Sequence, residues 1–416
     1  MANILLCAST FPRHADDPMV DFIWQQARYF KSCYSDLNIH VLVPHDTNTK
    51  SYENWEGVHI HRYRYFWPAK FQTLVYPAIW PNIKENKARV LLVPFLLLGL
   101  FFAAYKLAKK EKIDLIYSHW FMPQGLVCAA VAKLRRIPHV LTSHAADIII
   151  MRKIPLIGPL LVKKVLPSFK AVSFAGSRGR GQAMDFFDDD ADKAEFAEKS
   201  AVLPMGVDFA KPVVLVHAQK EENTLHLLFV GRLAEKKGVK YLLEAVKGAH
   251  QQGLTVYLDI LGDGPLEAEL KKLSETLELN NVVTFHGFVQ GSDKFKYIEH
   301  CDLFVVPSIV TDDGDAEGLP VSLLEAMAAG ALCCATDESG APDILDGNDT
   351  AFLVEAKSSD ALLQVMQTVN NMSEEERKRM AERARELGNS FLWENVIHRH
   401  YDYLLKDYIP QVGSVK

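Results

Sequence analysis

The 416-residue sequence has few cysteines and no paired cysteine motif. Its six cysteines form neither a C-x-x-C pair nor a histidine-spaced zinc pattern, which argues against a structural zinc site and against a disulfide framework. Reduced thiols, as in the cytosol, are the simplest interpretation. The amino terminus, MANILLCAST, lacks the positive segment of a signal peptide and predicts a buried first strand instead.

No apolar run reaches the roughly 20 residues that a transmembrane helix needs. The longest, from Val90 to Tyr105, is interrupted by Pro94 and Gly99. Two interpretations stay open, a buried core helix and a helix that lies in a membrane surface. Basic residues on both sides of the run favour the membrane surface. They are Lys84, Lys87, Arg89, Lys106, Lys109, Lys110 and Lys112.

The net charge of -6 conceals opposite charges in two parts of the chain. Residues 1–208 contain 26 Lys and Arg against 19 Asp and Glu, a balance of +7, and the remainder contains 20 against 33, or -13. From Lys84 to Arg180, 17 basic residues accompany only four acidic ones. Such a field attracts polyanions or an anionic membrane surface. We expect the membrane surface as a partner and no nucleic acid.

Short apolar segments alternate with helical patterns along the chain, which predicts an α/β fold. The predicted strands are NILLC, NIHVLV, VHIHRY, DLIYSH, HVLTSH and AVSFA, then LHLLFVG, VYLDILG, VVTFHG, DLFVVPS, ALCCATD and AFLVE. Several are nearly continuously apolar, which is typical of parallel strands buried on both faces. The alternation therefore predicts two doubly wound, Rossmann-like domains that face a central cleft, with ligands at the carboxyl ends of the strands.

The first domain is predicted at 1–208 and the second at 209–390, followed by a C-terminal helix at 391–416 that can pack back on the first domain. The polar stretch HAQKEENT, at 217–224, marks the linker or its end. No low-complexity segment interrupts this organisation.

The stretch DGDAEGLPVSLLEAMAAG contains two glutamates, Glu317 and Glu325, on either side of a predicted helix start. Gly318 and Pro320 indicate where this helix begins. The free N–H groups of a first helical turn bind anions, and phosphate is the usual occupant. Because a carboxylate repels phosphate, both glutamates make better acceptors for hydroxyl groups that flank a phosphate. A nucleotide sugar has hydroxyls on both sides of its diphosphate.

The loop GRLAEKKGV follows another predicted strand and contains Arg232, Lys237 and Gly238. Two cations in such a loop suit a diphosphate leaving group, on which charge builds as a glycosidic bond breaks. Alone, this loop is more often a solvated surface turn, and its place after a strand together with the glutamate pair favours the functional interpretation.

Two further turns follow neighbouring strands. LGDGP, with Gly262 and Gly264, opens a helix but matches neither a dinucleotide fingerprint nor a P-loop. FHGFVQ places the backbone of Phe288 and Val289 where it can meet a base edge. Taken alone, each is a plain turn.

Two histidines end predicted strands of the first domain. His144, in HVLTSHAADI, can donate to a sugar hydroxyl or a phosphate oxygen, and Asp147 can orient it or bind an acceptor. A structural histidine and a capping aspartate explain the same residues about equally well. His119 and Trp120, in YSHWFMPQG, either face an acceptor or fill the strand end.

These motifs together resemble a retaining glycosyltransferase of the GT-B fold, in the large family four that includes polysaccharide and lipopolysaccharide transferases. The resemblance covers nearly the whole chain. It rests on the E-x7-E motif at Glu317 and Glu325, on Gly231, Arg232, Lys237 and Gly238 in a G-R-x-x-x-x-K-G pattern, and on SHAAD as a form of H-G-x-D.

The resemblance implies a role for each matching residue. Arg232 and Lys237 would hold the donor diphosphate, and Glu325 the ribose hydroxyls. Glu317 would bind hydroxyls of the donor sugar near the reacting carbon, and His144 that sugar or its phosphate. The backbone of Gly318 and Leu319 would meet phosphate or sugar.

The implied activity is transfer of a hexose, with retention and without a metal, from a UDP- or GDP-linked sugar to a saccharide or polyprenyl-linked acceptor. The expected setting is the synthesis of a cell-surface polysaccharide on the cytoplasmic face of the membrane. The nucleotide sugar is a co-substrate, and no further cofactor is expected.

Other functions stay open at this point. The D-x-D pattern at Asp313 and Asp315 and the acidic run DFFDDDAD could bind magnesium, although Arg232 and Lys237 already supply positive charge. A sugar-nucleotide epimerase or a non-catalytic nucleotide-sugar-binding protein would use the same two-domain plan.

Overall fold

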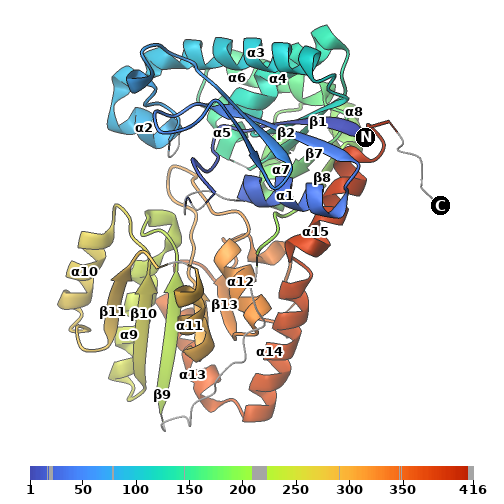
Figure 1. Cartoon of the computed structure of the whole chain (residues 1–416). Helices are drawn as coiled ribbons and strands as arrows, with labels where there is room; N and C mark the ends of the chain where they lie inside the picture. Colours follow the sequence, from blue (N-terminus) through green and yellow to red (C-terminus); the bar gives the residue numbers. More distant parts are fainter. Residues whose placement is uncertain are drawn as a thin grey trace. The chain divides into compact units, whose positions relative to one another are not determined.

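The computed structural model describes residues 1–15, 17, 22–76, 79–144, 146–208, 223–289, 291–345, 347 and 349–410. The chain forms two compact units, Met1–Gly206 with Trp393–Lys416, and Val207–Leu392. Each unit is a mainly parallel sheet with helices on both faces (Figure 1). Two doubly wound, Rossmann-like domains are therefore confirmed. The first unit ends near the predicted boundary at 208, and residues 217–222 of the predicted linker lie outside the described residues.

The first unit contains an eight-stranded sheet of order β3-β4-β2-β1-β5-β6-β7-β8. The strands are β1 (Ala2–Cys7), β2 (Leu37–Pro44), β3 (Tyr52–Trp55), β4 (Val58–Tyr63), β5 (Leu115–His119), β6 (His139–Ser143), β7 (Val172–Phe174) and β8 (Ser200–Val202). All pair in parallel except β3 with β4. The six predicted strands are present. The sequence does not predict the short edge strands β3 and β8, because neither contains an apolar run.

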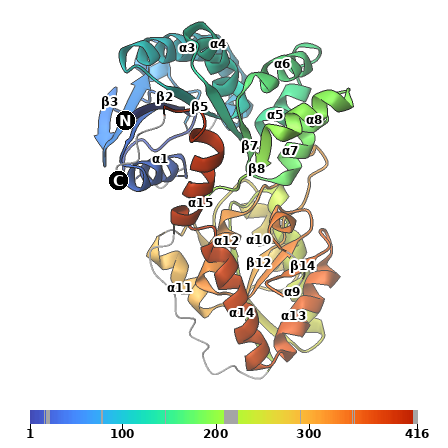
Figure 2. The ribbon, with the colours of Figure 1, turned by 90° about the vertical axis from the view of Figure 1, so that its right-hand side faces the viewer.

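Helices cover both faces of this sheet. They are α1 (Phe22–Cys33), α2 (Ile79–Glu85), α3 (Val93–Lys110), α4 (Leu126–Arg135), α5 (Ala146–Arg152), α6 (Ile157–Val165), α7 (Ser177–Met184), α8 (Asp190–Glu198) and α15 (Trp393–His400). On one face α3 and α4 pack against Leu5, and on the other Phe30 of α1 meets Tyr117. Helix α15 lies beside α1 (Figure 2), where Tyr29 stacks on Trp393. The last helix therefore belongs to the first unit.

The apolar run of the first unit lies in a longer helix than the sequence predicts. A 3-10 turn at Lys87–Leu92 leads directly into α3. The resulting helix, Lys87–Lys110, has 24 residues and a mean hydropathy of 2.2, and by length and composition alone it could cross a membrane. The expectation that the run is too short for a span is thus wrong. One face of α3 packs on the core of the first unit.

The second unit contains a six-stranded parallel sheet of order β11-β10-β9-β12-β13-β14. The strands are β9 (Thr224–Val230), β10 (Thr255–Leu261), β11 (Val283–Gly287), β12 (Leu303–Val306), β13 (Cys333–Thr336) and β14 (Phe352–Val354). All six predicted strands are present. The strand order reverses direction at β9, which is the point where open α/β sheets bind ligands.

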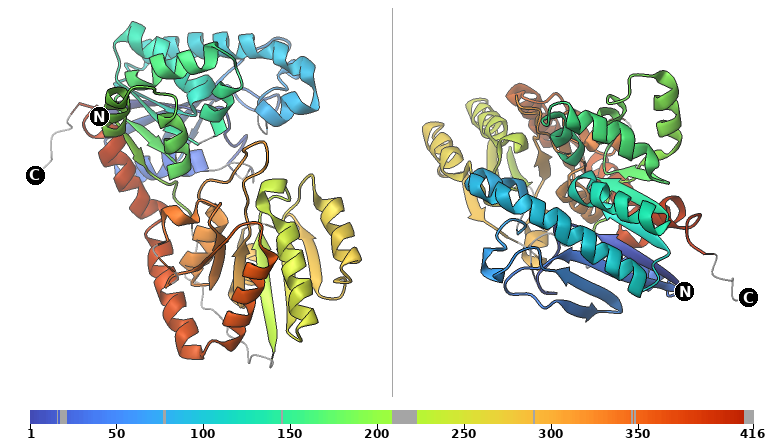
Figure 3. Two further views of the ribbon diagram at one scale, coloured as in Figure 1. Left: turned by 180° about the vertical axis from the view of Figure 1, so that it is seen from behind. Right: turned by 90° about the horizontal axis from the view of Figure 1, so that it is seen from above.

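The helices of the second unit are α9 (Val239–Gln251), α10 (Glu267–Thr276), α11 (Ser292–His300), α12 (Val321–Ala329), α13 (Ser359–Asn371) and α14 (Glu374–Asn389). α9 packs beside α13, and α12 beside α14 (Figure 3). With a helix layer on each face, the strand ends are the part of the sheet left open to a ligand.

Buried histidines make the first unit sensitive to acid. Burial lowers the pKa of His139 and of His144 to about 3, whereas an unfolded histidine titrates near 6.5. Between these values the unfolded chain binds more protons than the folded one, so stability falls as the pH drops from about 6.5 towards 3.

We predict that His139→Gln reduces the slope of the first unit's free energy of unfolding against pH by about 1.4 kcal/mol per pH unit between pH 6 and 4. Urea unfolding at several pH values measures this slope. The exposed His14 provides the control, since His14→Gln should leave the slope unchanged. An unchanged slope in the His139 variant would contradict the prediction.

Candidate functional site

The first part of the candidate site is the loop between β9 and α9. Leu233 anchors it, because its side chain is fully buried and its N–H donates to the carbonyl of Asp263 at 2.7 Å. Its own carbonyl accepts from the N–H of Leu266 at 3.0 Å. The adjacent Arg232 lies exposed, and none of the described residues pairs with its guanidinium. The loop is therefore fixed at its centre and presents a free cation.

Two glycines allow the loops of this edge to approach each other closely. Gly238 has φ of +63°, and a Cβ there would lie 1.9 Å from the carbonyl oxygen of Pro307. Gly262 has φ of +138°, and its Cβ would lie 1.9 Å from the carbonyl oxygen of Gly231. Only glycine fits at both places. The loops after β9, β10 and β12 are thereby held together.

Lys237 and Glu317 form an ion pair that joins the first loop to the loop before α12. The two side chains are only 13% and 15% exposed. The second carboxylate oxygen of Glu317 accepts from Ser308 Oγ at 2.6 Å. A partly buried ion pair of this kind is stabilised by its additional hydrogen bonds. Glu317 is thus held in one position, beside the cation predicted to bind diphosphate.

Glu325 lies one turn inside α12 and also has a lysine partner. Lys294 of α11 contacts both of its carboxylate oxygens at 2.7 Å. Helix α12 begins after Pro320, and no side chain caps its N-terminus. The predicted arrangement of Glu317 in the loop and Glu325 in the helix is confirmed.

The backbone at the start of α12 is also fixed by a close approach. A Cβ on Gly340 would lie 2.3 Å from the N of Leu319, and the Gly340 N–H donates to the carbonyl of Gly318 at 3.2 Å. The side of Gly318 where a Cβ would project is open, with no atom of the described residues within 4 Å. The backbone expected to meet a ligand is therefore rigid and accessible.

The structure brings the predicted donor residues to one edge of the second sheet. They are Gly231, Arg232, Lys237, Gly262, Gly264, Phe288, Val289, Glu317, Gly318, Leu319 and Glu325. Phe288 is 56% exposed and follows β11, the outer neighbour of β10. The roles of these residues stay predictions, but their common location is what a single ligand requires.

Sequence reasoning missed Lys294 and Ser308. Ser308 lies two residues after the end of β12, so its place near a strand end is a usable signal. Lys294 is 31 residues from Glu325 in sequence and lies on another helix, and nothing in its local sequence indicates the contact.

The D-x-D residues already have protein partners. Asp313 accepts from the Thr311 hydroxyl at 2.6 Å, and Asp315 pairs with Lys236 at 3.1 Å. Among the described residues, no group of three or more His, Cys, Asp or Glu side chains is arranged to hold a metal ion.

In the first unit, His144 and His119 are joined by a hydrogen bond. His119 Nδ1 lies 3.1 Å from His144 Nε2. Burial lowers the pKa of both, and the field of His400 lowers that of His144 further. Both rings are therefore neutral near pH 7. Among the described residues, the Nε2 of His119 is buried without a hydrogen-bond partner. A buried acceptor without a donor costs less than a buried N–H without an acceptor. His119 is therefore the donor, which leaves His144 with an N–H at Nδ1.

Two of the three predicted acceptor-binding residues are buried. His119 is 0% exposed and Asp147 is 4% exposed. Asp147 accepts from the Phe121 N–H and, at 2.9 Å, from the Ser143 hydroxyl. Direct contact of either side chain with an acceptor is therefore not supported, since almost none of their surface is exposed. Both instead position their neighbours.

Trp120 remains the accessible member of the predicted set. Its ring centroid lies 4.9 Å from that of His144. It has φ of +67°, a strained value for a tryptophan and one that occurs mostly at functional sites. Trp120 and His144 thus form one surface at the end of β5 and β6.

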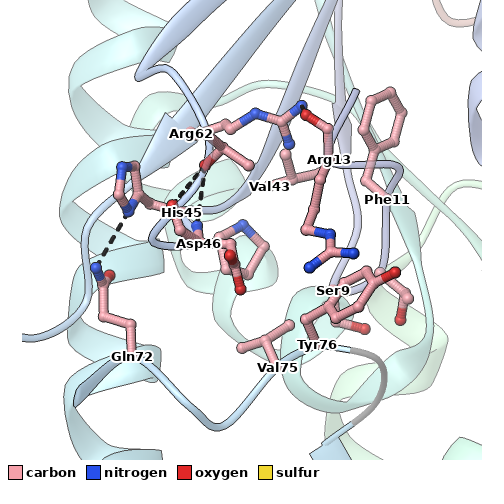
Figure 4. A pocket seen from close by; sticks show the side chains of 13 residues that line it. Ser9, Phe11, Arg13, Val43, His45, Asp46, Arg62, Gln72, Val75 and Tyr76 are labelled. Carbon is pink, nitrogen blue, oxygen red and sulfur yellow. Dashed lines mark hydrogen bonds between the residues drawn. The ribbon is translucent and has the colours of Figure 1, made fainter. Parts of the chain in front are cut away.

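A small pocket at the carboxyl ends of β1 and β2 was not predicted (Figure 4). The guanidinium of Arg13 lies 3.9 Å from the centre of the Tyr76 ring, and its Nε lies 3.2 Å from Asp17. Arg62, with a side chain only 2% exposed, donates to the carbonyl of Pro12 at 3.0 Å. The lining residues come from separate segments, so no local motif marks the pocket. They include Ser9, Thr10, Phe11, Val43, His45, Asp46, Gln72 and Val75.

Two family models match the chain. Residues 22–172 match the model described as Glycosyltransferase Family 4, and residues 216–387 match the model described as Glycosyl transferases group 1. The first match lies within the first unit, and the second match lies within the second unit.

Individual proteins show the same similarity. The chain is 34% identical over 213 residues to WcaL of Escherichia coli K12, which is named as a colanic acid biosynthesis glycosyltransferase, and the match spans about half of each chain, 50% and 51%. It is 26% identical over 285 residues to an Escherichia coli UDP-Gal:alpha-D-GlcNAc-diphosphoundecaprenol alpha-1,3-galactosyltransferase, across 64% of this chain and 69% of that one.

The fold matches solved structures over nearly its full length. Anabaena HepE in complex with UDP superposes with a TM-score of 0.67 at 16% identity, across 97% of this chain and 99% of that chain. At this identity the likeness concerns the fold.

We predict that Gly238→Ala lowers the free energy of unfolding of the second unit by more than about 2 kcal/mol, because the new Cβ clashes with Pro307 and the residue is held at positive φ. The matched control is Gly253→Ala, which has φ of +80° but open space around the Cβ. The control should lower the free energy of unfolding by only about 1–2 kcal/mol, the cost of positive φ for a residue with a Cβ. Equal losses in urea unfolding would show that the contact with Pro307 contributes nothing.

Proposed function

Because the chain belongs to the family-4 glycosyltransferases of the GT-B fold, we propose that it transfers a hexose from a nucleotide-diphosphate sugar to a saccharide or lipid-linked acceptor. The product would be part of a cell-surface polysaccharide. The observation that carries this proposal is the assembly of Arg232, Lys237, Glu317 and Glu325 at one edge of the second unit. No feature of the described residues favours an epimerase or a sensor over a transferase.

The second unit would bind the donor. Arg232 has its guanidinium free for the diphosphate, and Lys237, with three N–H groups, can contact a phosphate oxygen while it keeps Glu317 in place. Glu317 would accept hydroxyls of the sugar. Glu325 would accept ribose hydroxyls while Lys294 balances its charge. The cations would act most strongly as negative charge develops on the leaving diphosphate.

The proposed reaction retains the configuration of the transferred sugar. The acceptor hydroxyl oxygen would form a bond to the anomeric carbon on the face from which the diphosphate leaves. The bond from that carbon to the diphosphate oxygen breaks, and the acceptor proton passes to the departing diphosphate. No separate protein base is needed. Arg232 and Lys237 would supply the positive charge that a metal supplies in other transferases.

The first unit would bind the acceptor through Trp120, and His144 would keep the role expected of it, a contact with the donor sugar or its phosphate. A tryptophan ring offers an apolar face to a sugar ring, and the neutral His144 offers the Nδ1 N–H to an oxygen of the sugar or its phosphate. Because burial holds its pKa near 3, His144 would act as a hydrogen-bond donor rather than as a cation. His119 and Asp147 would hold this surface in place from beneath.

A panel of UDP- and GDP-linked sugars tests the proposed function. One nucleotide sugar should stabilise the protein by about 2.7 kcal/mol at 100 times its dissociation constant. That donor is then incubated with polyprenyl-diphosphate-linked saccharides, and label transfer is measured. If no nucleotide sugar stabilises the chain, the proposal fails.

We predict that Arg232→Ala and Lys237→Ala each reduce the transfer rate by about 10²- to 10³-fold, the effect of removing one preorganised charge-stabilising donor. Lys240→Ala, an exposed lysine nearby in sequence, is the control and should retain the normal rate. The wild-type rate should persist in EDTA. Complete loss in EDTA with recovery on adding magnesium or manganese would refute the metal-independent mechanism.

We also propose that the protein is cytoplasmic and bound peripherally to the inner face of the membrane through α3. This helix is apolar on two sides. Leu96, Leu100 and Ala104 face the core, and a second stripe is roughly half exposed. The stripe consists of Leu91, in the 3-10 turn that leads into α3, and of Phe95, Leu98 and Phe102 of α3, which are 71%, 48%, 56% and 55% exposed. Their spacing places them on one side of the helix.

Exposed basic residues surround this stripe. Lys106 and Lys109 continue it along the same side of α3, and Lys84 and Lys87 lie before its start. Apolar side chains next to lysines are typical of a helix that lies in an anionic membrane surface. A lipid-linked acceptor would be presented at that surface.

We predict that wild-type protein sediments with vesicles containing anionic lipid and that binding decreases with salt. The triple variant Lys106→Glu, Lys109→Glu and Lys110→Glu should bind much more weakly, since each basic residue near such a surface contributes about 1 kcal/mol. The same charge change at Lys271, Lys272 and Lys378 of the second unit is the control. Equal binding to neutral and anionic vesicles would contradict the electrostatic contribution.

A further inference from the structure

The connection between α5 and α6 contains a strained turn with an exposed leucine. Leu156 has φ of +63° and ψ of -50°, and the N–H of Ile157 donates to the carbonyl of Pro155 at 2.7 Å. These values define a γ-turn of the rare, positive-φ form. A leucine avoids this backbone because of its Cβ. The leucine side chain is also 88% exposed, so packing within the described chain does not explain its presence.

The surrounding chain holds the turn in this conformation. A Cβ on Gly158 would lie 1.9 Å from the carbonyl oxygen of Met151, and the Gly158 N–H donates to the carbonyl of Ile154 at 3.0 Å. The first turn of α6 is thereby pressed against the end of α5. Strain maintained by its surroundings occurs mostly at functional positions.

Leu156 belongs to a small cluster of exposed apolar side chains, here called the apolar tip. Its members are Ile154, Leu156, Ile157 and Leu160, which are 37%, 88%, 61% and 63% exposed. Single exposed apolar residues are ordinary, but four within seven residues form a patch. The exposed Lys153 and Lys164 flank it, while Arg152 and Lys163 pair with Asp185 and Asp188.

The apolar tip lies on the same side of the first unit as α3. Figures 1 and 2 both show α3 and α6 along the upper edge of this unit, and Figure 2 shows them displaced sideways from each other. A single helix in a membrane surface leaves the protein free to roll about the helix axis. A second contact beside it removes that freedom.

We propose that the apolar tip inserts into the anionic membrane surface as a second contact and, with α3, sets the orientation of the first unit on the membrane. This inference rests on the proposed peripheral membrane location. It accounts for both unfavourable features of Leu156, its strained backbone and its exposure to water, because an apolar side chain at the end of a rigid turn is suited to enter the acyl region. The flanking lysines then remain among the headgroups.

The deciding variant is Leu156→Gly, because glycine adopts positive φ without strain. We expect its unfolding temperature to be unchanged or up to about 4 °C higher. We expect its affinity for vesicles of mixed neutral and anionic lipid to fall about tenfold, which is the lower end of the effect of burying one leucine side chain. A loss of binding without a loss of stability separates a membrane contact from a structural role.

Two further variants complete the experiment. Glu278→Gly relieves positive φ at an exposed residue of the second unit, where φ is +60°, and should leave vesicle binding unchanged. Leu160→Ser removes an apolar side chain from the helical part of the tip, where no backbone strain is involved, and should also reduce binding several-fold. The donor-induced thermal shift should be normal in all three variants.

Normal vesicle binding by both Leu156→Gly and Leu160→Ser, with binding lost only in the α3 triple variant, overturns the inference and leaves the peripheral location intact. Failure of the wild type to bind vesicles overturns both the inference and the peripheral location. The donor-induced thermal shift then tests the proposed transferase activity separately. If the two tip variants instead abolish a concentration-dependent dimer seen by sedimentation, without affecting vesicle binding, the tip contacts a second copy and the inference is wrong.

Discussion

The ion pair between Lys237 and Glu317 is the interaction on which the candidate donor site depends. It joins two loops that follow different strands, and both of its ends are fixed by further contacts. Ser308 holds the second oxygen of Glu317 at 2.6 Å. The close approach of Gly238 to the Pro307 carbonyl brings the lysine to the glutamate. Removing one charge would leave the other partly buried and uncompensated, which is costly. The pair therefore serves as a structural clamp as well as a predicted contact to the ligand.

The two glutamates of this site have the same electrostatic arrangement. Each carboxylate is paired with a lysine from another element, Glu317 with Lys237 and Glu325 with Lys294. A diphosphate that enters near these residues would meet neutralised carboxylates and the free cation of Arg232. The difficulty of placing two carboxylates beside a phosphate, which the sequence alone raises, is thereby removed. Hydroxyl groups can still bind, because a paired carboxylate retains lone pairs that accept hydrogen bonds.

The sequence predicts those features of the fold and site that depend on neighbouring residues. Apolar runs predicted every strand except β3 and β8, and Gly318 with Pro320 indicated the start of α12. Contacts between distant segments could not be predicted in this way. Lys294 has no local signal for its contact with Glu325. His119 and Asp147 lie beside the kinked segment Phe121–Gly125, which contacts β5, β6 and α5 and whose Phe121 N–H donates to Asp147. Residue type and spacing thus indicated where the chemistry lies, while accessibility required the tertiary structure.

For helix α3, too, the sequence alone does not indicate which side chains are accessible. Its sequence has no charged residue from Val93 to Tyr105, so hydropathy alone gives similar support to a buried helix, a membrane span and a surface helix. The structure separates two stripes, one packed on the core of the first unit and one exposed beside lysines. Because the inner stripe already contributes to a folded core, extracting the helix to span a bilayer would expose that core to water. Burying only the outer stripe in a membrane surface avoids this cost and leaves the first unit intact. The acidic second part of the chain, with a balance of -13, would be repelled by anionic lipid, so any attraction to that surface has to come from the first unit.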